Sequence, residues 1–353
     1  MKTVRLGDMC DILDSKRMPV TKKDRQSGPY PYYGATGIQD YVANYIFNEP
    51  LILVGEDGAK WGAHENTAFA ISGKTWVNNH AHVLRPNREL VLDSWIVYYI
   101  NSTSQQDYIT GVTVPKLNQA MLRQIPIPLP SLEEQRRVVE RLDAAFEKID
   151  RAIELTEKNI EKINSLRLVA TRNLLERVDG QEKTVGEVIK LEYGKPLDRA
   201  DRKNNGKFAA YGANGIKDMT DRYYWDAPSI IVGRKGSAGE LTRVDEPFWP
   251  LDVTYYVTHD NTETNLDYIF YMLDSLNLPS HARGVKPGIN RNDVYSLPFK
   301  LPVIEEQEAT AKKIYTLCEQ TKNLTEQHRN KVVTLKALKQ SLLTQAFSQS
   351  EVE

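Results

Sequence analysis

The sequence YYGATGIQDYV (residues 32–42) is found a second time, with few changes, as AYGANGIKDMT (residues 210–220). Both stretches contain the frame Tyr-Gly-Ala-x-Gly-Ile-x-Asp, and its first glycines, Gly34 and Gly212, are 178 residues apart. The glycine spacing favours a tight turn over a helix or a strand interior, because glycine adopts a positive φ readily. Since the frame is nearly the same in both copies, we expect it to serve as scaffold.

The repeat extends along the chain. LILVGEDGAKWG (51–62) corresponds to SIIVGRKGSAGE (229–240), and each is an apolar, β-type run that ends in Val-Gly-x-x-Gly. GVTVPKLNQAMLRQIPIPLPSLEEQ (111–135) corresponds to GVKPGINRNDVYSLPFKLPVIEEQ (284–307). The beginnings of the two copies, RLGDMCDI near residue 5 and TVGEVIKL near residue 184, also match. The sequence therefore predicts a direct duplication of a unit about half the chain long.

Composition restricts the class of protein. A chain of 353 residues with 41% hydrophobic and 26% charged residues is typical of a folded protein of two ordinary domains. No run of 18 apolar residues occurs, so no membrane span is expected, and the N-terminal stretch has acidic residues where a signal peptide needs an apolar core. Two isolated cysteines favour neither a disulfide framework nor a zinc site. We therefore expect a cytoplasmic protein.

Each copy has two parts of different character. The first is rich in Gly, Pro, aromatic and β-branched residues and predicts a compact, mixed α/β (α+β) domain. IPIPLP (125–130) is expected to block regular structure, and the segment that follows contains no Gly or Pro up to residue 178. The predicted organisation is a globular domain at 1–130, a long helix at 131–178, a second globular domain at 179–302 and a second long helix at 303–353.

The two long helices carry a coiled-coil pattern. Ser131 and Glu134 form a capping box at the start of the first helix. Apolar residues then recur at alternating steps of three and four, which is the seam of a coiled coil. The expected seam residues are Leu142, Phe146, Ile149, Ile153, Thr156, Ile160 and Ile163 in the first helix, and Ile314, Leu317, Thr321, Leu324, His328, Lys331, Leu335, Leu338 and Leu342 in the second.

An exposed apolar stripe on one such helix needs a partner, and the other copy supplies it. We expect the helices to pair antiparallel, which would separate two similar globular domains related by an approximate twofold axis. The three polar seam positions of the second helix would weaken the pair but could fix its register.

These features together resemble the specificity subunit of type I restriction–modification systems. The resemblance covers essentially the whole chain, and its most specific parts are IPIPLPSLEEQRRVVERLDAAFEKID (125–150) and LPFKLPVIEEQEATAKKI (297–314). The second copy departs from the first at Lys300, which replaces Pro128, and at Val303, which replaces the capping Ser131. The start of the second helix is therefore less clearly marked.

The resemblance implies that each globular part is a target recognition domain that binds one half of a split site in double-stranded DNA. It also implies that the helices act as a spacer and as a platform for two modification subunits, which together with this chain form an N6-adenine methyltransferase. Restriction subunits would join for ATP-driven cleavage. S-adenosylmethionine, ATP and Mg²⁺ are then expected in the partner subunits and none of them in this chain, which is expected to be non-catalytic.

Contacts to DNA need side chains that reach base edges or phosphates. The candidates lie on the Val-Gly-x-x-Gly loops, near the second apolar run and just before the long helices. They are Lys60, Trp61, Lys74, Asn78, Asn79, Thr113, Lys116 and Asn118 in the first domain, and Arg234, Lys235, Ser237, Lys286, Asn290 and Arg291 in the second. For each of them, an ordinary surface or turn role is the alternative.

Three alternatives remain for the same sequence. His80 and His82 could ligate a metal, but no third ligand is evident nearby, so no metal site is expected. A specificity subunit whose partner fuses methylase and nuclease would have the same sequence features. A coiled-coil scaffold with protein- or glycan-binding ends is the alternative from another class, since Trp61, Trp76, Tyr32 and Tyr33 would suit sugar stacking.

Overall fold

The computed structural model describes residues 2–348, which form two compact units. Unit 1 holds residues 2–157 and 330–348, and unit 2 holds residues 158–329. We call the globular part of unit 1 (residues 2–130) domain 1 and that of unit 2 (residues 179–302) domain 2. The predicted last helix extends to residue 353, and residues 349–353 lie outside the described part.

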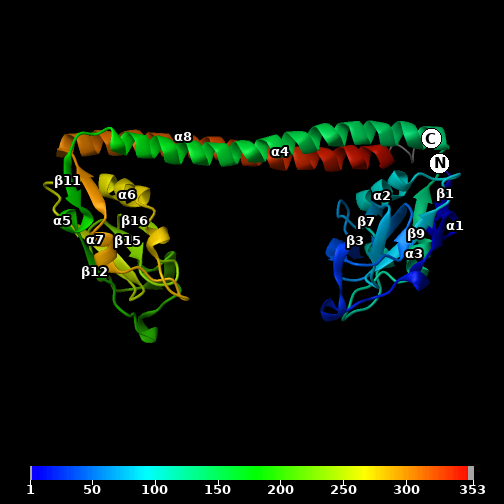
Figure 1. The fold of residues 1–353 in the computed structure, drawn as a ribbon, viewed down its shortest axis with the longest axis horizontal. Helices are drawn as coiled ribbons and strands as arrows, with labels where there is room; N and C mark the ends of the chain where they lie inside the picture. The colour runs from blue at the N-terminus through cyan, green and yellow to red at the C-terminus, as the bar shows by residue number, and fades with distance from the viewer. Residues whose placement is uncertain (1, 349–353) are drawn as a thin grey trace. The chain divides into compact units, whose positions relative to one another are not determined.

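The first copy begins with domain 1 and ends with a long helix (Figure 1). Its elements are β1 (Thr3–Arg5), α1 (Leu6–Met9), β2 (Cys10–Ile12), η1 (Asp14–Lys16), η2 (Lys22–Asp24), β3 (Ser27–Gly34), β4 (Gly37–Val42), β5 (Phe47–Asn48), β6 (Leu51–Gly55), β7 (Ala68–Ile71), β8 (Lys74–Val77), β9 (Ala81–Pro86), α2 (Asp93–Ser102), η3 (Gln106–Tyr108), α3 (Gln119–Gln124), β10 (Pro126–Pro128) and α4 (Leu132–Glu176).

The second copy repeats this order almost element for element. Its elements are β11 (Gln181–Thr184), α5 (Val185–Val188), β12 (Ile189–Tyr193), η4 (Arg199–Asp201), β13 (Phe208–Gly212), β14 (Gly215–Thr220), β15 (Ser229–Gly233), β16 (Leu241–Val244), β17 (Phe248–Pro250), β18 (Thr254–His259), α6 (Leu266–Ser275), η5 (Leu278–His281), α7 (Arg291–Tyr295), β19 (Pro298–Leu301) and α8 (Ile304–Ser348).

The sheets of the two domains have nearly the same topology, and β5 of domain 1 has no counterpart among the named strands of domain 2. In domain 1 the order β2-β9-β6-β7 forms the sheet under α2, and β12-β18-β15-β16 is its counterpart in domain 2. The second sheet is β4-β3-β8-β5 in domain 1 and β14-β13-β17 in domain 2, and a two-stranded ladder, β1-β10 or β11-β19, completes each domain. The predicted mixed α/β fold and the internal repeat are both confirmed.

The repeated glycine frame forms a hairpin in each domain. Gly37 has φ 124° and Gly215 has φ 102° at the start of β4 and β14, a conformation that favours glycine. The Val-Gly pair at the end of each central strand, β6 in domain 1 and β15 in domain 2, approaches this hairpin closely. A Cβ added to Gly55 would lie 3.2 Å from the carbonyl oxygen of Ala35, and one added to Gly233 would lie 2.9 Å from that of Ala213. The two repeated motifs are therefore parts of one scaffold.

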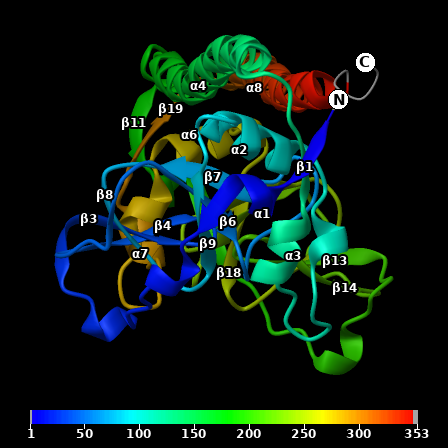
Figure 2. The ribbon, with the colours of Figure 1, turned by 90° about the vertical axis from the view of Figure 1, so that its right-hand side faces the viewer.

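The core of each unit joins a sheet, a short helix and the long helices. In unit 1, Trp95 of α2 is fully buried and its ring centroid lies 4.8 Å from that of Phe347 in α8. Phe146 of α4 and Ile52 of β6 belong to the same cluster. Figure 2 shows α2 between the sheet of domain 1 and the helices. Unit 2 has the equivalent arrangement, with α6, β15, α4 and α8 sharing one core.

The helices α4 and α8 are each 45 residues long over their described parts and pair antiparallel. In unit 1 the first half of α4 packs against the last part of α8, where Lys339 donates to Asp150 at 2.7 Å. In unit 2 the last part of α4 packs against the first half of α8, where Leu175 and Ile314 share a cluster. Opposite ends of the two helices therefore meet in each unit, as predicted.

The seam of α4 follows the prediction, whereas that of α8 is wrong at three of its nine predicted positions. Every predicted seam position of α4 is buried or half-buried. In α8, Leu324 and Leu338 are 40% and 46% exposed and Lys331 is exposed, while Thr325, Val332 and the partly covered Lys339 face inward. The predicted period is confirmed, but from Leu324 onward every second seam position lies one residue later than predicted. The assignment followed the leucines, whereas the helix buries a threonine and a valine.

The prolines before α4 do not block regular structure, contrary to the prediction. Pro126, Ile127 and Pro128 form the strand β10 and pair antiparallel with β1. A two-stranded ladder tolerates the missing N–H groups because each strand has a free edge. Ile127 is fully buried, so this short strand anchors the chain just before the long helix.

Both long helices begin at equivalent residues although only one has a side-chain cap. The hydroxyl of Ser131 accepts a hydrogen bond from the N–H of Glu134 at 3.2 Å, which is half of the predicted capping box. At α8 the carbonyl of Val303 alone accepts from Glu306 and Gln307. The second helix therefore starts without a cap at the place that the repeat indicates.

The glutamine of each Glu-Glu-Gln motif fixes the long helix to its domain. Gln307 is fully buried; its amide donates to the carbonyls of Glu263 (3.0 Å) and Pro302 (2.8 Å) and accepts from the N–H of Asn265 (2.9 Å). Gln135 makes the same three contacts in unit 1. The motif thus satisfies backbone groups at the start of α2 and α6, which explains why it occurs twice.

Among the described residues, no helix is both long and apolar enough to cross a membrane.

Candidate nucleic-acid interface

The loop after each central strand is held in the same way in both domains. In domain 1 the N–H of Glu56 donates to the carbonyl of His80 (2.8 Å), and its own carbonyl accepts from Leu117 (2.8 Å). In domain 2 Arg234 donates to Val253 (2.9 Å) and accepts from Ile289 (3.0 Å). The Val-Gly-x-x-Gly loop is thereby joined to the segment that precedes α3 or α7.

That preceding segment forms an exposed loop in each domain. Thr110 and Lys116 exchange two backbone hydrogen bonds (2.9 and 2.8 Å), as do Arg283 and Gly288 (2.9 and 3.0 Å). Between them the chain turns at a glycine with positive φ, and Val112 and Val285, which follow these glycines, are fully exposed. Both domains therefore present a short projecting loop beside the Val-Gly-x-x-Gly loop, which carries Glu56 and Asp57 in domain 1 and Arg234 and Lys235 in domain 2.

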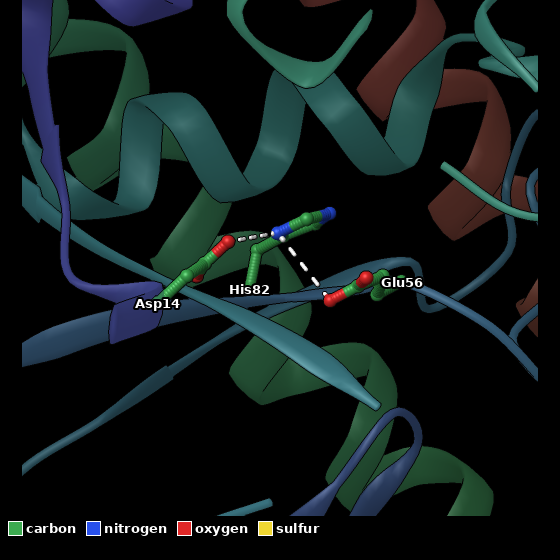
Figure 3. Close-up of side chains that lie close together, drawn as sticks. All are labelled: Asp14, Glu56 and His82. Atoms are coloured by element: carbon green, nitrogen blue, oxygen red, sulfur yellow. Dashed lines mark hydrogen bonds and ion pairs between the residues drawn. The ribbon is translucent and has the colours of Figure 1, made fainter. Parts of the chain in front are cut away.

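Under the loops of domain 1 lies a buried histidine with two acidic neighbours (Figure 3). His82 of β9 is fully buried; its Nδ1 lies 2.6 Å from Oδ2 of Asp14, and its Nε2 lies 2.7 Å from the carbonyl oxygen of Leu117. A carbonyl only accepts hydrogen bonds, and an ionised carboxylate only accepts them too. Both ring nitrogens of His82 therefore face oxygen acceptors, which fixes the orientation of the ring.

The charges of this cluster are balanced within domain 1. Glu56 pairs with Arg17, and its Oε1 lies 2.7 Å from Nζ of Lys116. Burial alone would raise the pKa of Asp14, but the hydrogen bond and charge of His82 outweigh it and hold this pKa below its ordinary value.

Asp14, Glu56 and His82 are close enough to be considered as a metal site, which sequence spacing did not reveal. His82 uses Nδ1 toward Asp14 and Nε2 toward a carbonyl, while Arg17 and Lys116 occupy Glu56. The donor atoms are therefore engaged with each other and with cations. His80, the other histidine of the motif, is half-exposed and pairs with Asp57 instead.

The structure divides the predicted DNA-contacting residues into two groups. Besides Asn290, which is exposed but caps a helix, six of them are exposed on loops or on a strand: Lys60, Lys74, Asn79, Thr113, Lys235 and Lys286. Lys74 stands apart from the rest of this group, because it lies on β8 in the second sheet, where its ammonium is 4.9 Å from the ring centroid of Tyr45. The other five lie on the two loops described above or in the turn between β8 and β9.

A second group of predicted residues is engaged within the protein. Trp61 donates to the carbonyl of Gly55 (3.0 Å) and packs against the core. Asn78 is buried and accepts from the N–H of His80 (2.8 Å). Asn118 and Asn290 are the N-caps of α3 and α7, each accepting a backbone N–H at 2.9 Å. These four side chains hold turns and helix starts.

The remaining predicted residues lie between these groups. Lys116 is partly exposed and paired with Glu56, and Ser237 is half-buried in the loop after β15. Arg234 and Arg291 are half-buried and lie over the ring of Tyr193, with guanidinium carbons 5.3 and 5.0 Å from its centroid. Tyr193 was not among the predicted residues, although its place at the end of an apolar run facing two arginines would have been a signal.

The chain is similar to known proteins over most of its length. Residues 1–165 and 177–334 match the family model of the type I restriction modification DNA specificity domain. The chain is similar to the type I restriction enzyme MjaVIII specificity subunit of Methanocaldococcus jannaschii, with 21% identity over 90% of this chain and 85% of the relative. It is 37% identical over 139 residues to the putative type I restriction enzyme specificity subunit S.HindORF215P of Haemophilus influenzae. The matched stretch covers 36% of that relative.

Two solved structures have a similar fold. One is a chain from a study of complex assembly and conformational transition of the type I R-M system, with a TM-score of 0.75 and 16% identity over 98% of this chain and 97% of that chain. The other is the HsdS subunit from Thermoanaerobacter tengcongensis, with a TM-score of 0.56 and 17% identity over 98% and 96%. At these identities the likeness concerns the fold.

Proposed function

Because the chain belongs to the type I restriction–modification DNA specificity domain family, we propose that it is the DNA-recognition subunit of a type I restriction–modification complex in the cytoplasm. Domain 1 and domain 2 each bind one half of a bipartite site in double-stranded DNA. The chain delivers partner subunits to that site and performs no catalysis of its own.

The observation that carries this proposal is one scaffold that presents different side chains in its two copies. The sheets, the hairpin and the glutamine contacts repeat, whereas the loop after the central strand carries Glu56 in domain 1 and Arg234 in domain 2. Exposed lysines such as Lys60, Lys235 and Lys286 flank these loops and suit contacts to phosphates. Two domains of equal fold and different chemistry suit the recognition of two different half-sites.

The proposed partners follow from the family. Two modification subunits bind this chain and supply S-adenosylmethionine-dependent methylation of adenine at N6. Restriction subunits supply the ATP- and Mg²⁺-dependent cleavage. These cofactors belong to the partners in this proposal.

The test is to express the chain with the modification subunits encoded beside it and to map methylated adenines at base resolution. We expect a gapped, two-part motif that appears only when chain and modification subunits are mixed. Methylation by the chain alone would refute the absence of catalysis, and a continuous motif, or none, would refute bipartite recognition. Binding of DNA by the complex should weaken steeply with salt, because phosphate contacts release counterions.

A further inference from the structure

Corresponding positions of the two domains can be equated from their strand registers. Val54 pairs with His82 across β6 and β9, and Val232 pairs with Tyr255 across β15 and β18, so His82 corresponds to Tyr255. On the neighbouring strand Ile12 pairs with Leu84, and Leu191 pairs with Val257, so Asp14, two residues after Ile12, corresponds to Tyr193. Three further pairs follow from the loops that both domains share: Glu56 and Arg234, Lys116 and Gly288, Gln119 and Arg291.

The side chains at these corresponding positions make contacts of a similar pattern. The Nε2 of His82 lies 2.7 Å from the carbonyl oxygen of Leu117, and the hydroxyl of Tyr255 donates to the equivalent carbonyl of Ile289 at 3.4 Å. Gln119 donates to Asp14 at 3.1 Å, and Arg291 lies over the ring of Tyr193. The positions are thus conserved in geometry, while their chemistry differs.

The two clusters differ in whether their charges are neutralised. In domain 1 the carboxylates of Asp14 and Glu56, whose side chains are 8% and 9% exposed, are paired with His82, Arg17 and Lys116. This set of charges is complete within the domain and presents no unpaired acid.

In domain 2 the equivalent cluster has cations without acids. Neither Arg234 nor Arg291 forms an ion pair within residues 2–348, and the Nε of Arg234 is buried without a hydrogen-bond partner. Gly288 stands where Lys116 closes the cluster of domain 1. Tyr193, on which both guanidinium groups lie, is 47% exposed, so the cluster opens to the surface.

We propose that Arg234 and Arg291, supported by Tyr193, each contact the edge of a guanine in the half-site of domain 2. This inference rests on the proposed function and names the residues and the base. A guanidinium fork matches O6 and N7 of guanine in the major groove. Domain 1 offers no such unpaired arginines at the equivalent positions, so its half-site is recognised by other side chains.

The choice of a base over a phosphate follows from how the arginines are held. The stacking on Tyr193 and the bond from Arg291 to the carbonyl of Leu191 (3.3 Å) limit the directions in which the guanidinium can point. Base recognition requires such a fixed orientation, whereas a phosphate accepts a cation from many directions.

The experiment uses the complex of the full chain with its modification subunits. Rates of methylation are measured on the cognate site and on sites in which each base pair of both half-sites is changed in turn. The variants are Arg234→Gln, Arg291→Gln and the charge-conserving Arg234→Lys and Arg291→Lys. Arg243→Gln is the matched control, because Arg243 lies in the same domain but is paired with Asp245 and Asp267.

We expect the glutamine variants to lose discrimination at one G·C pair of one half-site by roughly 5- to 150-fold, the range for a bidentate base contact. The lysine variants should lose it too, because an ammonium cannot replace the fork. Discrimination in the other half-site should be unchanged, which shows that the variant is folded and assembled. The control Arg243→Gln should behave as the wild type.

Two results would overturn the inference. One is unchanged discrimination at every G·C pair in the glutamine variants. The other is a uniform loss over all sequences that the lysine variants restore, since that behaviour marks a phosphate contact. If the wild-type complex itself yields no gapped motif, the proposed function fails, and that outcome is separate because it precedes any variant.

Discussion

Replacing Gln307 by methionine tests whether the Glu-Glu-Gln motif stabilises the junction of helix and domain. Methionine has a similar length and shape, but it cannot replace the three hydrogen bonds that the buried amide makes with Glu263, Asn265 and Pro302. Each lost bond leaves a backbone group unpaired at the start of α6 or α8. At roughly 1 kcal/mol for each bond, the free energy of unfolding of unit 2 should fall by about 3 kcal/mol.

The measurement is denaturant unfolding of the full chain, combined with hydrogen–deuterium exchange of the Asn265 amide. Exchange there should accelerate, because its acceptor is lost. Gln327→Met is the matched control, since Gln327 lies on the same helix with an exposed side chain. If the Gln307 variant were as stable as the control, with unchanged exchange at Asn265, the structural role of the motif would be disproved.

Three further predictions concern a turn, a thiol and a carboxylate. Gly215→Ala should lower the free energy of unfolding by about 1–2 kcal/mol, because the backbone φ at Gly215 is 102°. The control Gly62→Ala, at a glycine without a positive φ, should not lower it. Equal effects of the two variants in thermal melts would contradict this prediction. Burial raises the pKa of the Cys10 thiol to about 12, so iodoacetamide at pH 8 should modify only Cys318. Peptide mass spectrometry measures the labelling, and modification of both cysteines would argue against a buried Cys10. The folded pKa of Asp14 is lowered, so its stabilising contribution is complete above the ordinary pKa and is lost as pH falls through the folded value. Asp14→Asn should therefore reduce the loss of stability below about pH 4 in acid titrations, and an unchanged acid transition would refute it.

The sequence predicted the architecture because the repeat supplied each pattern twice. The hairpin frame, the apolar central strands and the heptad period are local signals, and each of them was confirmed. The seam of α8 shows the limit of such signals. A heptad pattern with steps of three and four can be assigned in two registers that differ by one residue. Whether Leu324 or Thr325 is buried depends on which face of α8 packs against α4, and the local sequence does not determine that face.

The candidate site was less accessible to sequence reasoning because its parts lie far apart in the chain. Asp14, Glu56 and His82 come from three elements that only the sheet order brings together. Asn118 and Asn290 have the chemistry of DNA contacts, but their position before a short helix makes them N-caps. The same residue types serve both purposes, and only the surrounding backbone distinguishes them.

The charge cluster under the loops of domain 1 restricts the mutational paths by which its recognition can evolve or be engineered. Arginine introduced first at Glu56 would add a cation beside Arg17, Lys116 and His82 in a poorly hydrated site, where repulsion is strong. If Lys116 is replaced first, Glu56 keeps Arg17 as its partner, and Glu56 can then be replaced by arginine with a smaller loss of folding stability. Libraries of single substitutions will therefore undersample viable new specificities, and the residues of this cluster are best varied together.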